Sequence, residues 1–134
     1  MDCVFCKIIA GQIPAAKVYE DDRAVAFLDI NPINPGHTLV VPKAHYADLL
    51  STPPDLAAHL MTVVQRVAAA VLAAVGVQDF NLGLNHGAGA GQSVGHVHLH
   101  IMPRRPGDGH TLFGGKPYPA GEMEKIAQKI KAAF

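Results

Sequence analysis

Three histidines at alternating positions are the residues of this chain best suited to chemistry. His96, His98 and His100 are separated by single aliphatic residues. Successive side chains of a β-strand point to opposite faces, so on a strand the histidines share one face and the aliphatic residues share the other. A helix is excluded, because residues two apart on a helix do not face each other. The sequence therefore predicts a strand with one reactive face, which Pro103 ends.

Two chemistries remain open for this face when only the residues are considered. A neutral imidazole is a competent nucleophile toward phosphorus, and a protonated neighbour can stabilise charge or protonate a leaving group. Alternatively, two histidines at positions i and i+2 can bind one zinc ion, whereas the outer pair lies about 7 Å apart along a strand. The glycine-rich loop 87–93 precedes the strand and ends in Gln92 and Ser93. Its backbone N–H groups and these two side chains offer donors to an anion, although the loop has no Walker motif.

A second candidate centre lies at the start of the chain. Cys3 and Cys6 have the spacing that supplies half of a tetrahedral zinc shell. His45 and His96 are the candidates for the other half. A redox pair is an alternative, but the βαβ context that it needs is missing. Two buried space-filling cysteines are a third possibility, and the abundance of histidine, eight residues in all, favours zinc.

Length and charge narrow the class of protein. The 134 residues predict a single domain, 1–134. Eleven basic residues balance eleven acidic ones, so nothing favours binding to nucleic acid or to an anionic membrane. We expect no leader peptide and no apolar run long enough to span a bilayer, which predicts a cytoplasmic protein.

Five strands and one long helix are predicted by the pattern of apolar residues. The predicted strands are 16–20, 24–30, 37–42, 79–85 and the histidine strand. A short helix or turn is expected over 3–11, and a last helix over 122–131. The long helix is expected to have Thr52 as its N-cap, Pro53 as its first residue and Gly76 at its end. Hairpin-type links predict an α+β fold in which this helix covers one face of an antiparallel five-stranded sheet.

His37 opens the third of these strands. It shares a strand face with Leu39 and Val41, so its side is otherwise apolar. A core histidine with satisfied hydrogen bonds and a catalytic histidine are equally compatible with this position.

The stretch from His96 to Met102 resembles the signature of the histidine triad (HIT) family, in which three histidines alternate with hydrophobic residues. The resemblance, to the Hint-like branch, extends to the segments 5–9, 13–14, 20–22, 26–30, 37–45 and 91–94. It covers about residues 3–103, and the C-terminal tail 107–134 lies outside it. In dimers of this kind leaving-group selectivity depends on C-terminal residues, so the resemblance leaves open a role for this tail at the site of a partner subunit.

The resemblance implies an activity and a quaternary structure. The expected activity is hydrolysis at the α-phosphate of purine nucleoside phosphoramidates or adenylates, through a nucleotidyl-histidine intermediate that water then cleaves. The expected ligands are purine nucleoside monophosphates such as AMP and GMP. The expected assembly is a homodimer that joins two sheets edge to edge into ten strands. Two alternatives are a dinucleoside polyphosphate hydrolase and a zinc-stabilised nucleotide-binding interaction protein with incidental turnover.

The resemblance also implies roles for individual residues. His98 matches the nucleophile, and His37 and His100 match histidines that assist it. Around the nucleotide it implies contacts from Phe27, Asp29, Ile30, Asn85, Gln92 and Ser93, with Asp29 on the ribose and Phe27 and Ile30 near the base. The implied ligands of a structural zinc ion are Cys3, Cys6, His45 and His96; such a closed shell of four ligands leaves His98 free.

Overall fold

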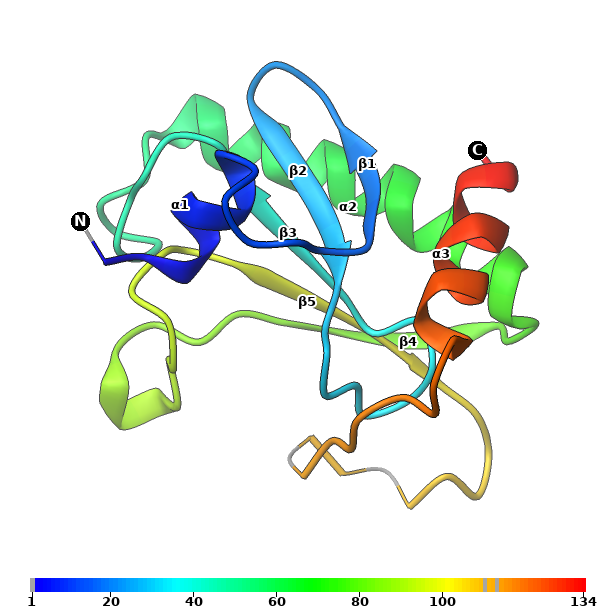
Figure 1. Cartoon of the computed structure of the whole chain (residues 1–134). Helices are drawn as coiled ribbons and strands as arrows, with labels where there is room; N and C mark the ends of the chain where they lie inside the picture. Colours follow the sequence, from blue (N-terminus) through cyan, green and yellow to red (C-terminus); the bar gives the residue numbers. More distant parts are fainter. Residues whose placement is uncertain (1, 110, 113) are drawn as a thin grey trace.

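A five-stranded antiparallel sheet forms the centre of the molecule (Figure 1). The computed structural model describes residues 2–109, 111–112 and 114–134. The strands are β1 (Lys17–Glu20), β2 (Ala24–Leu28), β3 (Thr38–Pro42), β4 (Asp79–Gly83) and β5 (Leu99–Arg104), arranged in the order β1-β2-β3-β5-β4. All neighbouring strands pair antiparallel, which confirms the predicted α+β architecture. The first four strands lie within two residues of their predicted bounds.

The long helix α2 (Pro54–Val75) covers one face of the sheet together with α3 (Glu122–Ala132), and it lies behind the sheet in Figure 1. Its predicted apolar stripe is buried; the members are Leu56, Leu60, Val63, Val67 and Val71. Gly76 ends the helix in the left-handed conformation, at φ +72°, which a residue without a side chain adopts at little cost. Ile126 and Ile130 of α3 are buried in the same core.

The start of α2 differs from the prediction. The helix begins at Pro54, Pro53 is the preceding residue, and no side chain caps the first turn. The Thr52 hydroxyl donates instead to the Asp48 carbonyl, at 2.7 Å, within the turn that leads into the helix. Pro54, at the first helical position, has no N–H, so the first turn has one donor fewer to satisfy.

The expectation that no segment is long and apolar enough to span a bilayer was wrong for α2. Its 22 residues and a mean hydropathy of 1.6 meet that requirement. Seven of its eight buried residues nevertheless belong to the core that it shares with the sheet and α3. The hydrophobicity of α2 is therefore that of a core helix.

The other face of the sheet carries the short helix α1 (Val4–Ile9). Alternation along β2 shows the two faces clearly, since Ala24 and Leu28 contact the core under α2 whereas Phe27 belongs to the core under α1. Phe5 and Ile8, one helical turn apart, are the buried residues of α1. The N-terminal segment thus covers the face of the sheet onto which the histidines project.

The histidine strand is shifted from its predicted bounds. β5 begins at Leu99, so His96 and His98 lie in the segment just before it, and Pro103 lies inside it, opposite Phe80 of β4. The Pro103 carbonyl accepts a hydrogen bond from the Asn34 side chain, on the side away from β4. The nitrogen of a strand residue lies on the same side as its carbonyl, and β3 ends its pairing at Ile101. The missing N–H of Pro103 therefore costs no ladder hydrogen bond.

The C-terminal end of the tail packs on the chain that carries it. α3 packs on α2 through Ile126, Ala127 and Ile130. Gly115 lies directly against the backbone of Asn31. Burial of this apolar helix face fixes the tail to the domain that carries it.

Candidate active site and metal centre

His98 presents an unprotonated nitrogen to the reactive face. Its Nδ1 lies 2.8 Å from the carbonyl oxygen of His96. A carbonyl oxygen only accepts, so Nδ1 carries the proton and Nε2 of the neutral ring keeps its lone pair. Burial lowers the pKa of His98, with the backbone hydrogen bond and Asp29 opposing. The ring is therefore neutral near pH 7, which is the form that a nucleophile requires.

His37 and His100 form a hydrogen-bonded pair whose direction is also fixed. The Ile33 N–H donates to Nδ1 of His37 at 3.1 Å, so the proton of neutral His37 is on Nε2. That nitrogen lies 3.0 Å from Nδ1 of His100 and donates to it. The proton of neutral His100 is then on Nε2. Burial, followed by the neighbouring His98 and His37, lowers the pKa of His100 to about 4.

Burial also lowers the pKa of His37, while Asp29 opposes this shift. The carboxylate of Asp29 lies 3.6 Å from Nε2 of His37 and accepts from the Asn31 N–H at 2.9 Å. Asp29, His37 and His100 bring three possible ligand atoms within 4.8 Å of one another. A metal ion on Nε2 of His37 would, however, require a proton on Nδ1, where the Ile33 N–H already donates. The geometry suits proton sharing better than metal binding.

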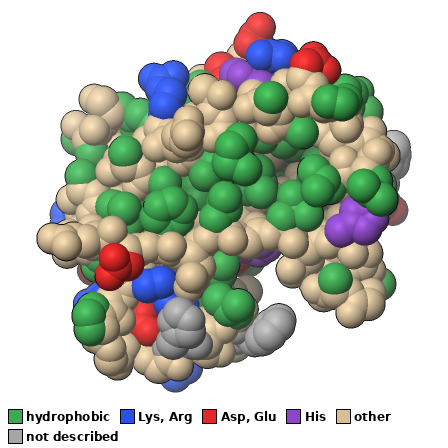
Figure 2. Space-filling model, turned by 180° about the vertical axis from the view of Figure 1, so that it is seen from behind, with side chains coloured by type: hydrophobic (Ala, Val, Ile, Leu, Met, Phe, Trp, Pro, Cys, Tyr) green, Lys and Arg blue, Asp and Glu red, His purple; other side chains and the backbone are tan. Residues whose placement is uncertain are grey.

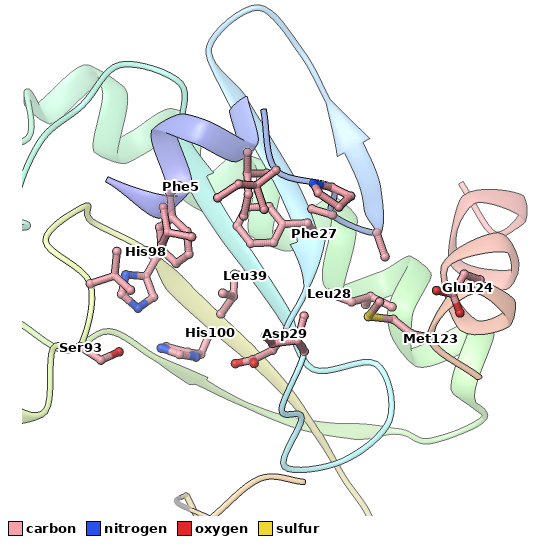
Figure 3. Close-up of a pocket in the computed structure, with 18 residues that line it drawn as sticks. Phe5, Phe27, Leu28, Asp29, Leu39, Ser93, His98, His100, Met123 and Glu124 are labelled. Atoms are coloured by element: carbon pink, nitrogen blue, oxygen red, sulfur yellow. The ribbon is translucent and has the colours of Figure 1, made fainter. Parts of the chain in front are cut away.

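A cavity of about 580 Å³ opens beside these histidines. In Figure 3 the rings of His98 and His100 lie side by side, close to Ser93 and Asp29. Most of the remaining wall is apolar. It is contributed by α1, β2, β3 and the segments that follow α1 and β2, and it includes Phe5, Ile8, Ile13, Phe27, Ile30 and Leu39. A planar apolar group thus fits at one end of the cavity and an anion fits at the histidine end.

A second cavity, of about 360 Å³, adjoins the first. The two share Asp29, Ser93 and His100. Asn85 and His37 line the second cavity from the sheet side, and Leu112, Gly114 and Gly115 line it from the tail. His100 therefore faces a compartment on each side.

The structure changes the expectations for the glycine-rich loop. Its N–H groups at residues 90–92 donate to carbonyls of the same loop, around the short 3-10 helix η1 (Ala88–Ala90), and so are not free for an anion. The Gln92 side chain accepts from Gly87 N–H at 2.8 Å and donates to the carbonyls of Ala47 and Val94. Gln92 therefore shapes the loop and lines neither cavity.

Cys3, Cys6, His45 and His96 come together as predicted, with all four ligand atoms within 4.8 Å of one another. Nδ1 of His96 lies 3.4 Å from Sγ of Cys3 and 3.1 Å from Nδ1 of His45. Sγ of Cys6 lies 3.3 Å from Nδ1 of His45. Ligands about 2.0–2.3 Å from one zinc ion are separated by roughly 3–4 Å, so the spacing fits.

The protonation of His96 supports the fit. Its Nε2 lies 2.8 Å from the Pro42 carbonyl and must donate to it, so Nδ1 keeps its lone pair and points at the cysteines. Metal-bound histidines typically donate their other N–H to such a carbonyl. Two thiols and two imidazoles form a closed tetrahedral set, so the cluster is consistent with a structural zinc site, not a catalytic one.

Phe5 is the functional residue that the sequence reasoning missed. Its ring centroid lies 5.1 Å from that of His98 and 5.9 Å from that of His96, in edge-to-face contacts. It also contacts Phe27 and lines the larger cavity. The signal available in the sequence was its position between the two cysteines: a helix this short buries few side chains, so its one aromatic residue is expected to face the site.

Comparison with known proteins agrees with this geometry. The sequence matches the HIT domain family over residues 10–107. An adenosine 5'-monophosphoramidase of Schizosaccharomyces pombe is 38% identical, covering 98% of this chain and 100% of that protein. An adenylylsulfatase of Arabidopsis thaliana is 48% identical over 80% of this chain, which spans 54% of that protein's length.

The fold is matched by solved structures as well. The crystal structure of a zinc-bound histidine triad family protein from Mycobacterium smegmatis is 40% identical, with a TM-score of 0.90 over 99% of this chain and 93% of that one. These matches define a nucleotide hydrolase of the histidine triad type. The chain belongs to the HIT family, in its Hint-like branch.

Proposed function

We propose that this chain cleaves the bond between the α-phosphate and the leaving group of purine nucleoside phosphoramidates or adenylates, with His98 as the nucleophile. The observation that carries the proposal is the free Nε2 lone pair of His98, held by the Nδ1 hydrogen bond to the His96 carbonyl. The names of the fission yeast and Arabidopsis relatives support this substrate class.

In the first step Nε2 of His98 bonds to the α-phosphorus and the bond from phosphorus to the leaving nitrogen breaks. The nitrogen keeps the electron pair and takes the proton from Nε2 of His100. The Nε2–H of His37, which donates to Nδ1 of His100, stabilises the negative charge that this transfer leaves on the ring. In the second step water attacks phosphorus, the bond to His98 breaks, and the proton of the water returns to His100.

The nucleoside is held by the walls of the larger cavity. We assign the base to the apolar end, between Phe27 and Ile30, and the ribose hydroxyls to the carboxylate of Asp29. Ser93 and Asn85 line the smaller cavity beside His100, where the leaving group departs. Gln92 supports the phosphate side only indirectly, through the loop that it closes.

Zinc at the cysteine cluster is the second part of the proposal. Cys3, Cys6, His45 and His96 would hold the ion, which supplies a structural cross-link between the N-terminus and the segment before β5. Thiolate ligands persist in a reducing compartment, which agrees with a cytoplasmic location. The ion takes no part in the chemical steps.

The functional unit that we propose is a homodimer. β4 is an edge strand, and edge strands offer unpaired backbone groups to a second copy. Phe80 and Leu82 of β4 are 38% and 41% exposed, and Met61 of α2 is 44% exposed. Figure 2 shows a band of hydrophobic side chains across this back face of the molecule. Pairing of two β4 strands would give ten continuous strands, and sedimentation of the purified protein at twice the chain mass checks this.

Hydrolysis of a fluorogenic adenosine phosphoramidate tests the activity. The wild-type protein is expected to turn it over, and mass spectrometry of an acid-free quench is expected to find a nucleotidyl group on His98. The variant His98→Asn is expected to lose about 10³-fold or more in kcat. Tight AMP binding without turnover would instead support a binding protein, and faster cleavage of diadenosine polyphosphates would support the alternative hydrolase.

A further inference from the structure

The tail after β5 lies against the loop that leads to His37. This loop, 31–36, follows β2 and turns the chain back into β3. The Lys116 N–H donates to the Pro32 carbonyl at 3.2 Å, and the Gly36 N–H donates to the Tyr118 hydroxyl at 3.1 Å. The tail therefore holds the loop by hydrogen bonds near both of its ends.

A third contact holds the middle of the loop. The side-chain amide of Asn34 donates to the Pro103 carbonyl and to Oδ2 of Asp108, both at 2.9 Å. The other carboxylate oxygen of Asp108 accepts from the guanidinium of Arg104 at 3.0 Å. Arg104 is only 6% exposed, so this ion pair is buried and is screened little by solvent. Asn34 is thereby tied to a rigid point at the end of β5.

The loop in turn sets the proton on His37. The Ile33 N–H, directly before Asn34, donates to Nδ1 of His37 at 3.1 Å. Without that donor, the neutral ring would place its proton on either nitrogen. With the proton on Nδ1, His37 could no longer donate to His100. The direction of the hydrogen bond between His37 and His100 therefore depends on the position of the Ile33 N–H.

We propose that Asn34 and Tyr118 are positioning residues that hold the Ile33 N–H on His37, so that the tail keeps the His37 proton directed at His100. Neither residue touches the cavity wall at the histidines; each acts through the loop 31–36. The tautomer part of this inference stands on the hydrogen bonds alone. Its catalytic consequence rests on the proposed role of His100.

Tyr19 provides a matched control for a change of tyrosine to phenylalanine. Its hydroxyl donates to Oδ2 of Asp21 at 2.7 Å, next to the turn between β1 and β2. Tyr19→Phe and Tyr118→Phe each remove one hydroxyl and one hydrogen bond from a partly buried tyrosine. They differ in that only Tyr118 contacts the loop before His37.

The first measurement needs no substrate. The 15N shifts of the imidazole nitrogens of the substrate-free, full-length protein report which nitrogen of His37 is protonated. Wild type and Tyr19→Phe are expected to show the Nε2–H tautomer, and Asn34→Ala and Tyr118→Phe a mixture of both. Wild-type shifts in both of these variants would overturn the proposal.

The second measurement is kinetic. Asn34→Ala and Tyr118→Phe are expected to lower kcat on the adenosine phosphoramidate by roughly tenfold, with KM within about twofold, because binding groups are untouched. Tyr19→Phe is expected to stay within about twofold in both parameters. Altered tautomers with unchanged kcat would overturn the catalytic consequence. A wild-type protein with the Nε2–H tautomer and no turnover would count against the proposed function, not against the positioning.

Discussion

The cysteine cluster and the Asp29 cluster have nearly the same dimensions, but the first is suited to bind a metal ion and the second is suited to share a proton. In each, the possible ligand atoms lie within 4.8 Å of one another. At the cysteine cluster, the Pro42 carbonyl takes the proton of His96 and leaves a lone pair facing the centre. At the Asp29 cluster, the Ile33 N–H occupies the outer nitrogen of His37 and places a proton in the centre. The outer hydrogen bond of each ring, more than the spacing of the rings, separates a metal site from a proton-sharing pair.

The largest effect is expected from breaking the cysteine cluster. Cys6→Ala removes one of four ligands, so zinc is expected to fall from about one per chain to near zero and the free energy of unfolding by about 3 kcal/mol or more. Elemental analysis and urea denaturation measure the two quantities. The variant Ile9→Ala, also on α1 but not a ligand, is the control and is expected to retain zinc. Full zinc content in Cys6→Ala would show that the cluster is not the site.

Breaking the Asp29 cluster is expected to lower the activity and to leave the zinc content unchanged. His37→Ala removes the donor to His100, so kcat on the adenosine phosphoramidate is expected to fall by about 10²-fold, as for loss of a general acid–base group. Zinc content is expected to stay near one per chain. His59→Ala, on α2 and away from both clusters, controls for the loss of a histidine. A kcat within threefold of wild type would mean that His100 acts without His37.

Phe5 contacts His96 of the cysteine cluster and also His98, whose ring packs against His100 of the Asp29 cluster, so a smaller side chain there is expected to disturb both sites mildly. Phe5→Leu removes the edge-to-face contacts with His96 and His98 and is expected to lower the free energy of unfolding by about 1–2 kcal/mol. KM is expected to rise because the smaller side chain makes less contact with a nucleoside in the larger cavity. Denaturation and steady-state kinetics measure these effects, and a change in neither would show that the clusters are independent.

The smallest effect is expected from pH within the neutral range. The pKa of His100 is about 4 and burial holds the pKa of His98 below 6.5. Both rings are then neutral between pH 7 and 8, so kcat/KM is expected to vary by less than about twofold there and to fall only at a pH below the ordinary histidine pKa of about 6.5. A fall in kcat/KM with its midpoint at pH 6.5 would mean that the two rings are exposed to solvent during catalysis.

Stability is expected to follow the same histidines. Burial lowers the pKa of His37, His96, His98 and His100 in the folded chain. Below pH 6.5 the unfolded chain therefore binds more protons than the folded one, so the free energy of unfolding falls as the pH falls. Urea denaturation at pH 7.5 and 5.5 measures the difference.

The sequence predicted which candidate site residues lie together far better than it predicted their protonation. Alternation put His98 and His100 on one face, and the cysteine spacing with two distant histidines predicted the zinc cluster that the structure assembles. The proton positions depend on backbone groups of Pro42, Ile33 and His96, and every residue type offers those. In the glycine-rich loop 87–93, likewise, only the fold shows that the N–H groups of residues 90–92 donate to carbonyls of the loop itself.

The distance along the chain between the parts of the cysteine cluster has a consequence for biosynthesis. Cys3 contacts His96, which lies 93 residues later. On the ribosome, the segment around Cys3 must wait until four of the five strands have emerged before it can pack over its face of the sheet. Contacts this far apart form late and slowly, because the intervening chain must be ordered first. Metal capture would thus be one of the last events in maturation, and a bulky fusion at the first residues would delay it more than one at the C-terminus.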